Sequence, residues 1–374
     1  MKENPLLKLN KLGQSIWLDY TRRDLIASGA LRRLIEEDGL RGMTSNPSIF
    51  ERAIVSSEHY EEDIRAMAFR RESPKDIYES VSQQDVRAAA DEFRRVYDAE
   101  DGEDGFVSLE VNPHLAHDTK GTLVEARRLW RALNRPNVFI KVPATAEGVP
   151  AIQQLITEGI NVNVTLLFGL PRYREVAEAC IAGLEARAAE GKPLKSVASV
   201  ASFFLSRIDS LVDPKLEKLI AGGGANANVA GDVRGEVAIA SAKVAYQIYK
   251  ELFSSERFQG LAAQGARGQR LLWASTSTKN PDYSDLKYVE ALIGEDTINT
   301  VTLETLDAYR DHGEPKLRLE DDLAKAEWVL EQLPTAGIDL NAVTTQLEDE
   351  GVEKFNQAFD KLMSVLSQKI VSAL

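Results

Sequence analysis

Eight short runs rich in β-branched and aromatic residues recur along the 374-residue chain, and segments with a helical spacing of apolar residues separate them. Strands that alternate with helices form a parallel sheet, because each parallel pair needs a crossover connection. Eight such units in a chain of this length predict an α/β fold, a closed (β/α)8 TIM barrel with extra helices. A doubly wound open sheet is the alternative. The runs span residues 15–20, 42–46, 106–111, 138–143, 161–168, 196–204, 270–276 and 297–304.

Alternation of polar and apolar residues inside the runs favours the barrel over the open sheet. In the run 161–168, Asn161, Asn163 and Thr165 fall on one face, whereas the residues between them are apolar. Strands of an open parallel sheet are buried on both faces and are usually apolar throughout. The alternation therefore predicts a lumen that presents polar groups and an outer face that packs on helices.

Two intervals between the runs are longer than a single-helix crossover, and the C-terminal segment has a helical pattern. We expect residues 1–374 to form one barrel domain with helical insertions near 51–105 and 205–269 and a helical tail over 321–374. Ser73 is the expected N-cap of a helix in the first insertion. The tail carries an apolar stripe that fits either a cover over the active site or a partner surface. The stripe consists of Val352, Phe355, Phe359, Leu362, Met363 and Leu366.

Composition narrows the class of partner. The net charge of −13 argues against nucleic acid and anionic membrane surfaces. The chain has no apolar run long enough to predict a membrane span, and residues 1–17 lack the apolar core of a signal peptide. A single cysteine, Cys180, excludes an internal disulfide and indicates a reducing cytoplasm. We expect a cytoplasmic protein whose partners are small molecules; both a monomer and a homodimer fit the sequence.

Lys141 lies in the middle of an apolar run, VFIKVP (138–143), and is a candidate nucleophile. A free lysine amine has a pKa of about 10.4, and burial among apolar side chains favours the neutral form of an amine. A neutral amine can attack a carbonyl and form a Schiff base, whose iminium withdraws electrons from a neighbouring C–C bond. The alternative is a lysine that extends to solvent or pairs with a carboxylate.

Two carboxylates are expected at the same end of the barrel as Lys141. Asp19 lies at the end of the first run and Glu110 near the end of the third, and alternation directs both to the lumen. Schiff-base chemistry needs proton transfers at the carbinolamine and at a substrate hydroxyl, which carboxylates can perform. Asp19 could instead cap the helix that follows it. Glu110 is harder to explain as structure, because an unpaired buried carboxylate is costly.

Further polar residues lie at or just beyond strand ends, in positions suited to a substrate. Thr165 and Ser202 are lumen hydroxyls, and Asn46 precedes a proline, which is also a typical helix start. Arg207 and Lys279 lie just past the sixth and seventh runs, where barrel enzymes often bind phosphate. Taken singly, each cation fits a surface salt bridge better.

Two other motifs point to different chemistry but lack the context that it needs. His114 and His117 form H-x-x-H, which is half of a zinc site, but no third ligand is obvious, so we expect no metal and no other cofactor. Residues 222–227 fit G-x-G-x-x-A, but they follow a helical pattern rather than a strand, so a mobile loop is expected. The non-enzyme alternative is a barrel that binds a sugar phosphate without turnover.

The segments SIWLDYTRR, GMTSNPSIF, SLEVNP, VFIKVPAT, NVNVTLLF and VASFFLSRIDSLVD occur in the order and at the spacings of transaldolases. The chain resembles the longer bacterial subfamily over about residues 10–310, and its helical tail is similar to that of the family. The resemblance implies a barrel of the class I aldolase type that needs no metal. It implies transfer of a dihydroxyacetone unit from fructose 6-phosphate or sedoheptulose 7-phosphate to erythrose 4-phosphate or glyceraldehyde 3-phosphate, in the non-oxidative pentose phosphate pathway. An aldolase that releases a free three-carbon ketone is the nearest alternative.

The resemblance also implies catalytic roles. Lys141 resembles the Schiff-base lysine, and Glu110 resembles the acid/base that acts on the carbinolamine through a water positioned by Thr165. Asp19 resembles the base that deprotonates the sugar hydroxyl and so starts C–C cleavage. Asn46 resembles the residue that hydrogen-bonds the substrate hydroxyls.

For the phosphate, the resemblance implies contacts from Ser202 and Arg207. After the seventh run the chain departs from the shorter, better-known subfamily, in which an alanine-serine pair is followed two residues later by an arginine. Here Ser277 stands in place of that arginine. We expect Lys279 to be the replacement cation, with Ser275 beside it.

Overall fold

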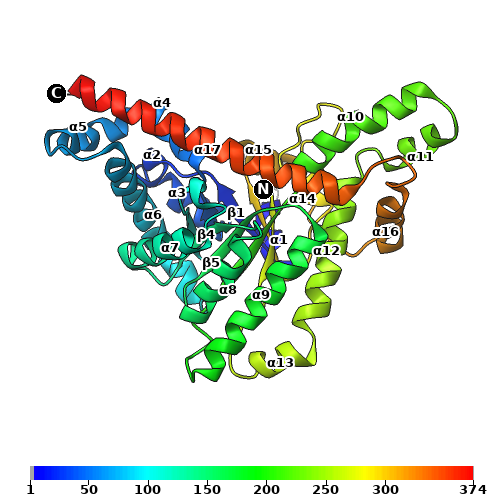
Figure 1. Cartoon of the computed structure of the whole chain (residues 1–374), viewed down its shortest axis with the longest axis horizontal. Coiled ribbons are helices and arrows are strands. Elements are labelled where there is room, and N and C mark those ends of the chain that lie inside the picture. The colour runs from blue at the N-terminus through cyan, green and yellow to red at the C-terminus, as the bar shows by residue number, and fades with distance from the viewer. Residues whose placement is uncertain (1–3, 374) are drawn as a thin grey trace.

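Eight parallel strands form a closed barrel in the computed structural model, which describes residues 4–373 (Figure 1). Each strand is hydrogen-bonded to the next in chain order, and β8 pairs with β1 to close the sheet. The predicted barrel is therefore confirmed, and the open-sheet alternative is wrong. The strands are β1 (Gln14–Asp19), β2 (Gly42–Thr44), β3 (Phe106–Glu110), β4 (Val138–Pro143), β5 (Val162–Leu167), β6 (Ser199–Phe204), β7 (Arg270–Ala274) and β8 (Thr297–Val301).

Helices connect the strands and form the outer layer of the barrel (Figure 1). Among residues 4–373, no helix combines the length and the apolar character that crossing a membrane requires. The α-helices are α1 (Pro5–Lys11), α2 (Arg23–Ala27), α3 (Ala30–Glu37), α4 (Pro47–Ser56), α5 (Glu61–Phe69), α6 (Pro74–Ala99), α7 (Thr119–Leu133), α8 (Gly148–Glu158), α9 (Leu170–Ala189), α10 (Ser206–Gly222), α11 (Ala225–Val233), α12 (Val237–Phe253), α13 (Glu256–Ala262), α14 (Lys287–Glu290), α15 (Leu303–His312), α16 (Leu323–Gln332) and α17 (Leu340–Ala373). Two short 3₁₀ helices are η1 (Glu58–Tyr60) and η2 (Pro113–Leu115).

Aromatic side chains fill the lumen at the N-terminal end of the strands. Trp17 stacks on Phe139 with 6.1 Å between ring centroids and lies 6.5 Å from the Phe106 ring. The indole Nε1 donates a hydrogen bond of 2.7 Å to Asp104 just before β3. Gly42 faces this ring so closely that an added Cβ would lie 2.4 Å from it, so β2 needs glycine here. Because these rings fill the N-terminal end of the lumen, the polar residues of the lumen lie toward its C-terminal end. Barrel enzymes have their active sites at that end.

The first long interval, between β2 and β3, contains α4 to α6 and corresponds to the expected helical insertion. Ser73 caps α6: its hydroxyl accepts from the Asp76 N–H at 3.2 Å, and the Asp76 carboxylate accepts from the Ser73 N–H at 3.3 Å. This reciprocal capping box confirms the predicted helix start.

The second long interval contains α10 to α13, and α11 begins within residues 222–227, where a mobile loop was expected. The glycines of the 222–227 motif connect α10 to α11, so they join two helices rather than a strand and a helix. Sequence reasoning missed α11 because ANANVAGDV has too few large apolar residues, over too few turns, to show a helical period.

The C-terminal helix α17 crosses the C-terminal end of the barrel (Figure 1). It packs against α4, α5, α6, α10 and β5. Five members of the predicted apolar stripe are buried in these contacts and Met363 is half-buried. Of the two interpretations of the stripe, a cover over the barrel is therefore the one that the fold supports.

Gly351 lets α17 approach the barrel closely. A Cβ added there would lie 2.9 Å from Cδ2 of Leu166 and 3.7 Å from the guanidinium of Arg207. Leu166 itself has a φ of +53°, and the pairing of β5 with β6 shifts register between Val164 and Leu167. Helix α17 and the end of β5 therefore pack closely against each other at this point.

We expect Gly351→Leu to move α17 away from the barrel. Overpacking typically lowers the free energy of unfolding by about 1–3 kcal/mol. Gly260→Leu in α13 is the matched control, because nothing lies within 4 Å of an added Cβ there. Urea denaturation measures the effect; equal stability of the two variants would contradict the close-approach role.

Candidate active site

Lys141 is buried in the lumen near the C-terminal end of β4. Its side chain is 5% exposed, and its Nζ donates a hydrogen bond of 3.1 Å to the carbonyl oxygen of Ser45. The prediction that hydrocarbon surrounds this amine is wrong in its geometry, because Val138, Ile140 and Val142 alternate to the opposite, helix-facing side of β4. Oxygen atoms of neighbouring strands contact the amine instead.

Glu110 is the carboxylate nearest to this amine, with Oε2 3.7 Å from Nζ of Lys141. The two residues are register partners on β3 and β4, so the barrel itself sets their separation. Burial raises the pKa of Glu110 to about 7, the positive charge of Lys141 opposes that rise, and the negative charge of Asp19 adds to it. A carboxyl group with this pKa can both accept and release a proton at neutral pH.

Asp19 lies at the end of β1 and faces the same cavity. Its carboxylate accepts a hydrogen bond of 2.8 Å from the hydroxyl of Thr44, and that hydroxyl lies 3.0 Å from the hydroxyl of Thr300. The following helix, α2, begins after Arg22 and receives no side-chain cap. The capping alternative for Asp19 is therefore wrong, and two lumen hydroxyls hold the carboxylate in place.

Asn46 has the structural role of starting a helix, and it also lies in the site. Its Oδ1 accepts from the N–H of Ile49 at 3.0 Å and so caps α4. Because the cap uses the oxygen, the amide nitrogen is the group left to donate to a ligand. Asn46 lines the cavity together with Ser48 in the next turn.

A row of polar side chains crosses the lumen beneath the cavity. Ser202 donates to Oδ1 of Asn163 at 2.7 Å, and Nδ2 of Asn163 donates to the hydroxyl of Ser108 at 3.0 Å. Thr165 lies one lumen layer above Asn163, in register with Pro143. Its Oγ1 is buried and has no hydrogen-bonding partner in the described part of the chain, so it can still bind a small polar group.

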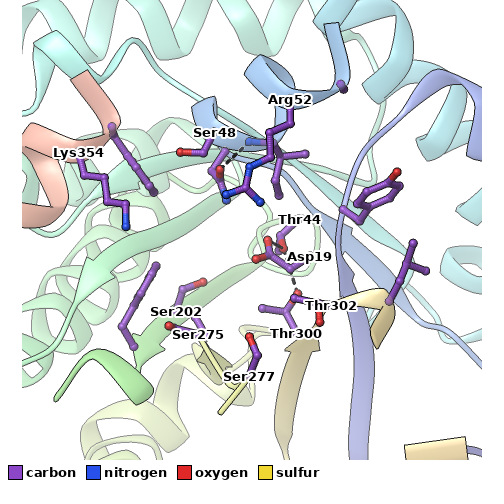
Figure 2. Close-up of a pocket in the computed structure, with 18 of the residues that line it drawn as sticks. Asp19, Thr44, Ser48, Arg52, Ser202, Ser275, Ser277, Thr300, Thr302 and Lys354 are labelled. Atoms are coloured by element: carbon purple, nitrogen blue, oxygen red, sulfur yellow. Dashed lines mark hydrogen bonds between the residues drawn. The ribbon is translucent and has the colours of Figure 1, made fainter. Parts of the chain in front are cut away.

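Polar residues at the C-terminal end of the barrel surround a cavity of about 480 Å³ (Figure 2). Glu110 and Thr165 do not line it, and no hydrogen bond joins Glu110 to Thr165 within residues 4–373, so the role that they would share remains a prediction. The other seven predicted site residues all line the cavity: Lys141, Asp19, Asn46, Ser202, Arg207, Ser275 and Lys279.

Arg207 and Lys279 bring positive charge to one side of the cavity. Arg207 follows β6, and its guanidinium lies 5.4 Å from the centre of the Phe204 ring; burial lowers its pKa. Lys279 follows β7 and donates to the hydroxyl of Ser277 at 3.3 Å. Burial lowers the pKa of Lys279, and the charge of Arg207 lowers it further. Neither cation forms an ion pair within residues 4–373, so the surface salt-bridge alternative is wrong for both.

Ser275 adopts a left-handed backbone conformation, with a φ of +55°, directly after β7. Its hydroxyl lies 3.0 Å from that of Ser206, and its carbonyl accepts from the Ser206 N–H at 3.0 Å. This pairing joins the β7 loop to the start of α10 and so holds Arg207 and Lys279 on the same side of the cavity.

Sequence reasoning missed two further cations in the cavity lining, Arg52 and Lys354. Arg52 was detectable, because it lies one helical turn after Ser48 on a helix that starts at the barrel rim. Lys354 was not, because its place depends on where α17 packs across the barrel.

The two histidines of the H-x-x-H motif do not come together at one site. His114 contacts Asp360 at 2.7 Å and His117 contacts Glu147 at 3.1 Å, both at exposed positions. No group of three or more metal-ligating side chains occurs among the residues that the structure describes. The two histidines therefore bind separate carboxylates.

Comparisons with known proteins show which family the chain is similar to. The model of the family described as Transaldolase/Fructose-6-phosphate aldolase matches residues 16–366. The chain is 49% identical to Transaldolase 2 of Nostoc sp., with 99% of this chain and 98% of the relative covered. It is 48% identical to a transaldolase of Trichodesmium erythraeum, with 99% and 98% covered. It is 44% identical to a transaldolase of Saccharopolyspora erythraea, with 98% and 97% covered.

Proposed function

The chain belongs to the transaldolase family, and we propose that it transfers a dihydroxyacetone unit between sugar phosphates through a Schiff base on Lys141. It is a transferase of ketone residues in the non-oxidative pentose phosphate pathway. One observation carries the proposed mechanism: the buried amine of Lys141, which lines the cavity together with Asp19, lies 3.7 Å from the buried carboxyl group of Glu110.

The first steps take place at Nζ of Lys141. Its lone pair attacks the C2 carbonyl carbon of a ketose phosphate, such as fructose 6-phosphate or sedoheptulose 7-phosphate, and the carbonyl oxygen becomes the hydroxyl of a carbinolamine. Two protons convert the carbonyl oxygen to water, and Glu110 relays both from the nitrogen. It takes the first, which frees the lone pair, and gives it to the oxygen during the attack; it then takes the second and gives it to the hydroxyl, which leaves as water. The iminium remains. A pKa of about 7 suits both transfers, and we assign the relaying water to Thr165, because its buried hydroxyl has no hydrogen-bonding partner within residues 4–373.

Cleavage takes place on the side of Asp19. Its carboxylate takes the proton of the C4 hydroxyl, the C3–C4 bond breaks, and its electron pair flows to the iminium nitrogen to give an enamine. The aldose phosphate leaves with C4 as its aldehyde carbon. The enamine then attacks the aldehyde of an acceptor, erythrose 4-phosphate or glyceraldehyde 3-phosphate, and Asp19 returns its proton to the new hydroxyl. The amide of Asn46 holds the hydroxyls of the three-carbon unit, and hydrolysis of the iminium frees the product.

The phosphate group is bound by Arg207 and Lys279, with Ser202 and Ser275 as hydroxyl contacts. Unpaired cations beside hydroxyl groups match the charge and the acceptor oxygens of a phosphate. We place the enzyme in the cytoplasm; its single cysteine, Cys180, is buried and unpaired, which fits a reducing compartment.

Neutralising Arg207 should mainly weaken substrate binding. Loss of a charge-assisted hydrogen bond is worth about 1.5–3 kcal/mol, so Arg207→Met should raise KM for fructose 6-phosphate about 10- to 100-fold and change kcat only a few-fold. Lys279→Met should act in the same direction but less strongly, because Lys279 is nearer to solvent. Steady-state kinetics test this; a loss of kcat with unchanged KM would contradict a phosphate role.

The family description also includes an aldolase, so the acceptor has to be tested directly. With fructose 6-phosphate and erythrose 4-phosphate, the proposed activity yields sedoheptulose 7-phosphate and glyceraldehyde 3-phosphate. Release of free dihydroxyacetone at the same rate, with or without erythrose 4-phosphate, would show an aldolase instead. Binding of sugar phosphate without any product would favour a barrel without turnover.

A further inference from the structure

The side chains of Arg52 and Lys354 extend into the catalytic cavity from outside the barrel, Arg52 from α4 and Lys354 from α17 (Figure 2). Within residues 4–373 neither charged group has a carboxylate or another hydrogen-bonding partner. Their neighbours on the same two helices do pair: Lys361 of α17 contacts Glu51 of α4 at 2.8 Å. We call Arg52 and Lys354 the outer pair.

The outer pair faces the same space as the two cations at the strand ends. The charges of Arg207, Lys354 and Arg52 all lower the pKa of Lys279, beyond the effect of burial. Four unpaired cations thus face one cavity in a chain with a net charge of −13. Like charges this close repel one another, and an anion bound between them removes that repulsion.

The two pairs differ in height above the barrel. Arg207 and Lys279 come directly after β6 and β7, whereas Arg52 lies nearly two turns along α4, about 9 Å of helix rise beyond its cap. Lys354 lies above the rim on α17, next to Phe355, which is buried and also lines the cavity. The outer pair is exposed to solvent, so it contacts a bound anion from the entrance side.

We propose that the outer pair is a second set of ligands for the substrate phosphate, and that α17 therefore binds substrate as well as covering the barrel. The inference rests on the proposed function of the cavity. A phosphate between Lys354 and Arg52 bridges α17 and α4, two helices that already pack together. Phosphate binding then stabilises the docked position of α17.

Paired acceptors that differ only in the phosphate test this role. Arg52→Met and Lys354→Met should each raise KM for erythrose 4-phosphate about 3- to 10-fold, and the double variant about 10- to 50-fold, because exposed charges contribute less than buried ones. KM for unphosphorylated erythrose should stay within about twofold, and Lys354→Arg should restore most of the affinity. Lys369→Met, the same change farther along the same helix and outside the cavity, removes only a 3.7 Å contact to the exposed Glu61 and should match the wild type.

Hydrogen exchange provides a second readout with inorganic phosphate as the probe. Saturating phosphate should slow amide exchange in α17 of the wild type but not of Lys354→Met. An unchanged KM for erythrose 4-phosphate in the double variant, or an equal rise for both acceptors, would overturn the inference. Such a failure leaves the Schiff base untouched, because borohydride trapping at Lys141 does not depend on the outer pair; loss of trapping would overturn the proposed function instead.

Discussion

Lys141→Met should fold normally and lose turnover by at least about a thousandfold. Methionine keeps the length and the hydrocarbon of lysine but cannot form an imine, and no second amine lies at the floor of the cavity within residues 4–373. The other lysines of the lining, Lys279 and Lys354, lie at or above the barrel rim. The rate of transfer from fructose 6-phosphate to erythrose 4-phosphate measures the effect.

The fold of this variant should survive because Glu110 can respond to the change. Without the positive charge of Lys141, the pKa of Glu110 rises further, and the carboxyl group stays neutral in its buried site. Circular dichroism and retained binding of a sugar phosphate serve as controls. A folded Lys141→Met enzyme with a near-normal rate would remove the Schiff base from the mechanism.

Glu110→Gln should lower kcat about 10²- to 10⁴-fold, the usual contribution of a general acid or base, with little change in KM. Glutamine fills the same space but carries no transferable proton, so formation of the imine slows while the substrate still binds. Single-turnover measurement of imine formation separates this step from binding. A change confined to KM would contradict the acid/base role.

The pH profile gives a second test of the same residue. Below about pH 7 the carboxyl group of Glu110 is protonated, so it cannot accept a proton from the amine. We expect kcat/KM of the wild type to rise with pH through about 7 and this limb to be absent from Glu110→Gln. A limb that persists in the variant would belong to another group.

The contribution of Glu110 to the free energy of unfolding should show the opposite trend and fall as the pH rises. The pKa of Glu110 is raised from an ordinary 4.5 to about 7 on folding, so the folded state binds its proton more tightly. The stabilisation is fully present below about pH 4.5 and is lost as the pH rises through about 7. Urea denaturation at about pH 5 and pH 8 should therefore show wild type losing stability relative to Glu110→Gln as the pH rises.

The sequence carried enough information to predict the barrel and the catalytic floor. Alternation within strands directs Asp19, Glu110 and Lys141 to the lumen, and parallel order brings their strand ends to one rim. In the run VFIKVP the same alternation turns Val138 and Ile140 toward the helices, so they do not surround the amine. The error concerned the surroundings of the amine and not its position.

Residues whose place depends on packing between distant segments could not be found in this way. Lys354 reaches the cavity because Gly351 lets α17 pack against Leu166, more than 180 positions earlier in the chain. No local period encodes that contact. Arg52 is an intermediate case. Once the barrel is known, its position on α4, counted from the Asn46 cap, directs its side chain to the rim.

Borohydride trapping tests the Schiff base most directly. Reduction of the wild-type enzyme in the presence of fructose 6-phosphate converts an iminium to a stable secondary amine, and peptide mass spectrometry locates the modified lysine. The mechanism predicts one three-carbon adduct on the peptide that contains Lys141, and none in Lys141→Met. An adduct on another lysine, or full turnover with no adduct at all, would contradict it.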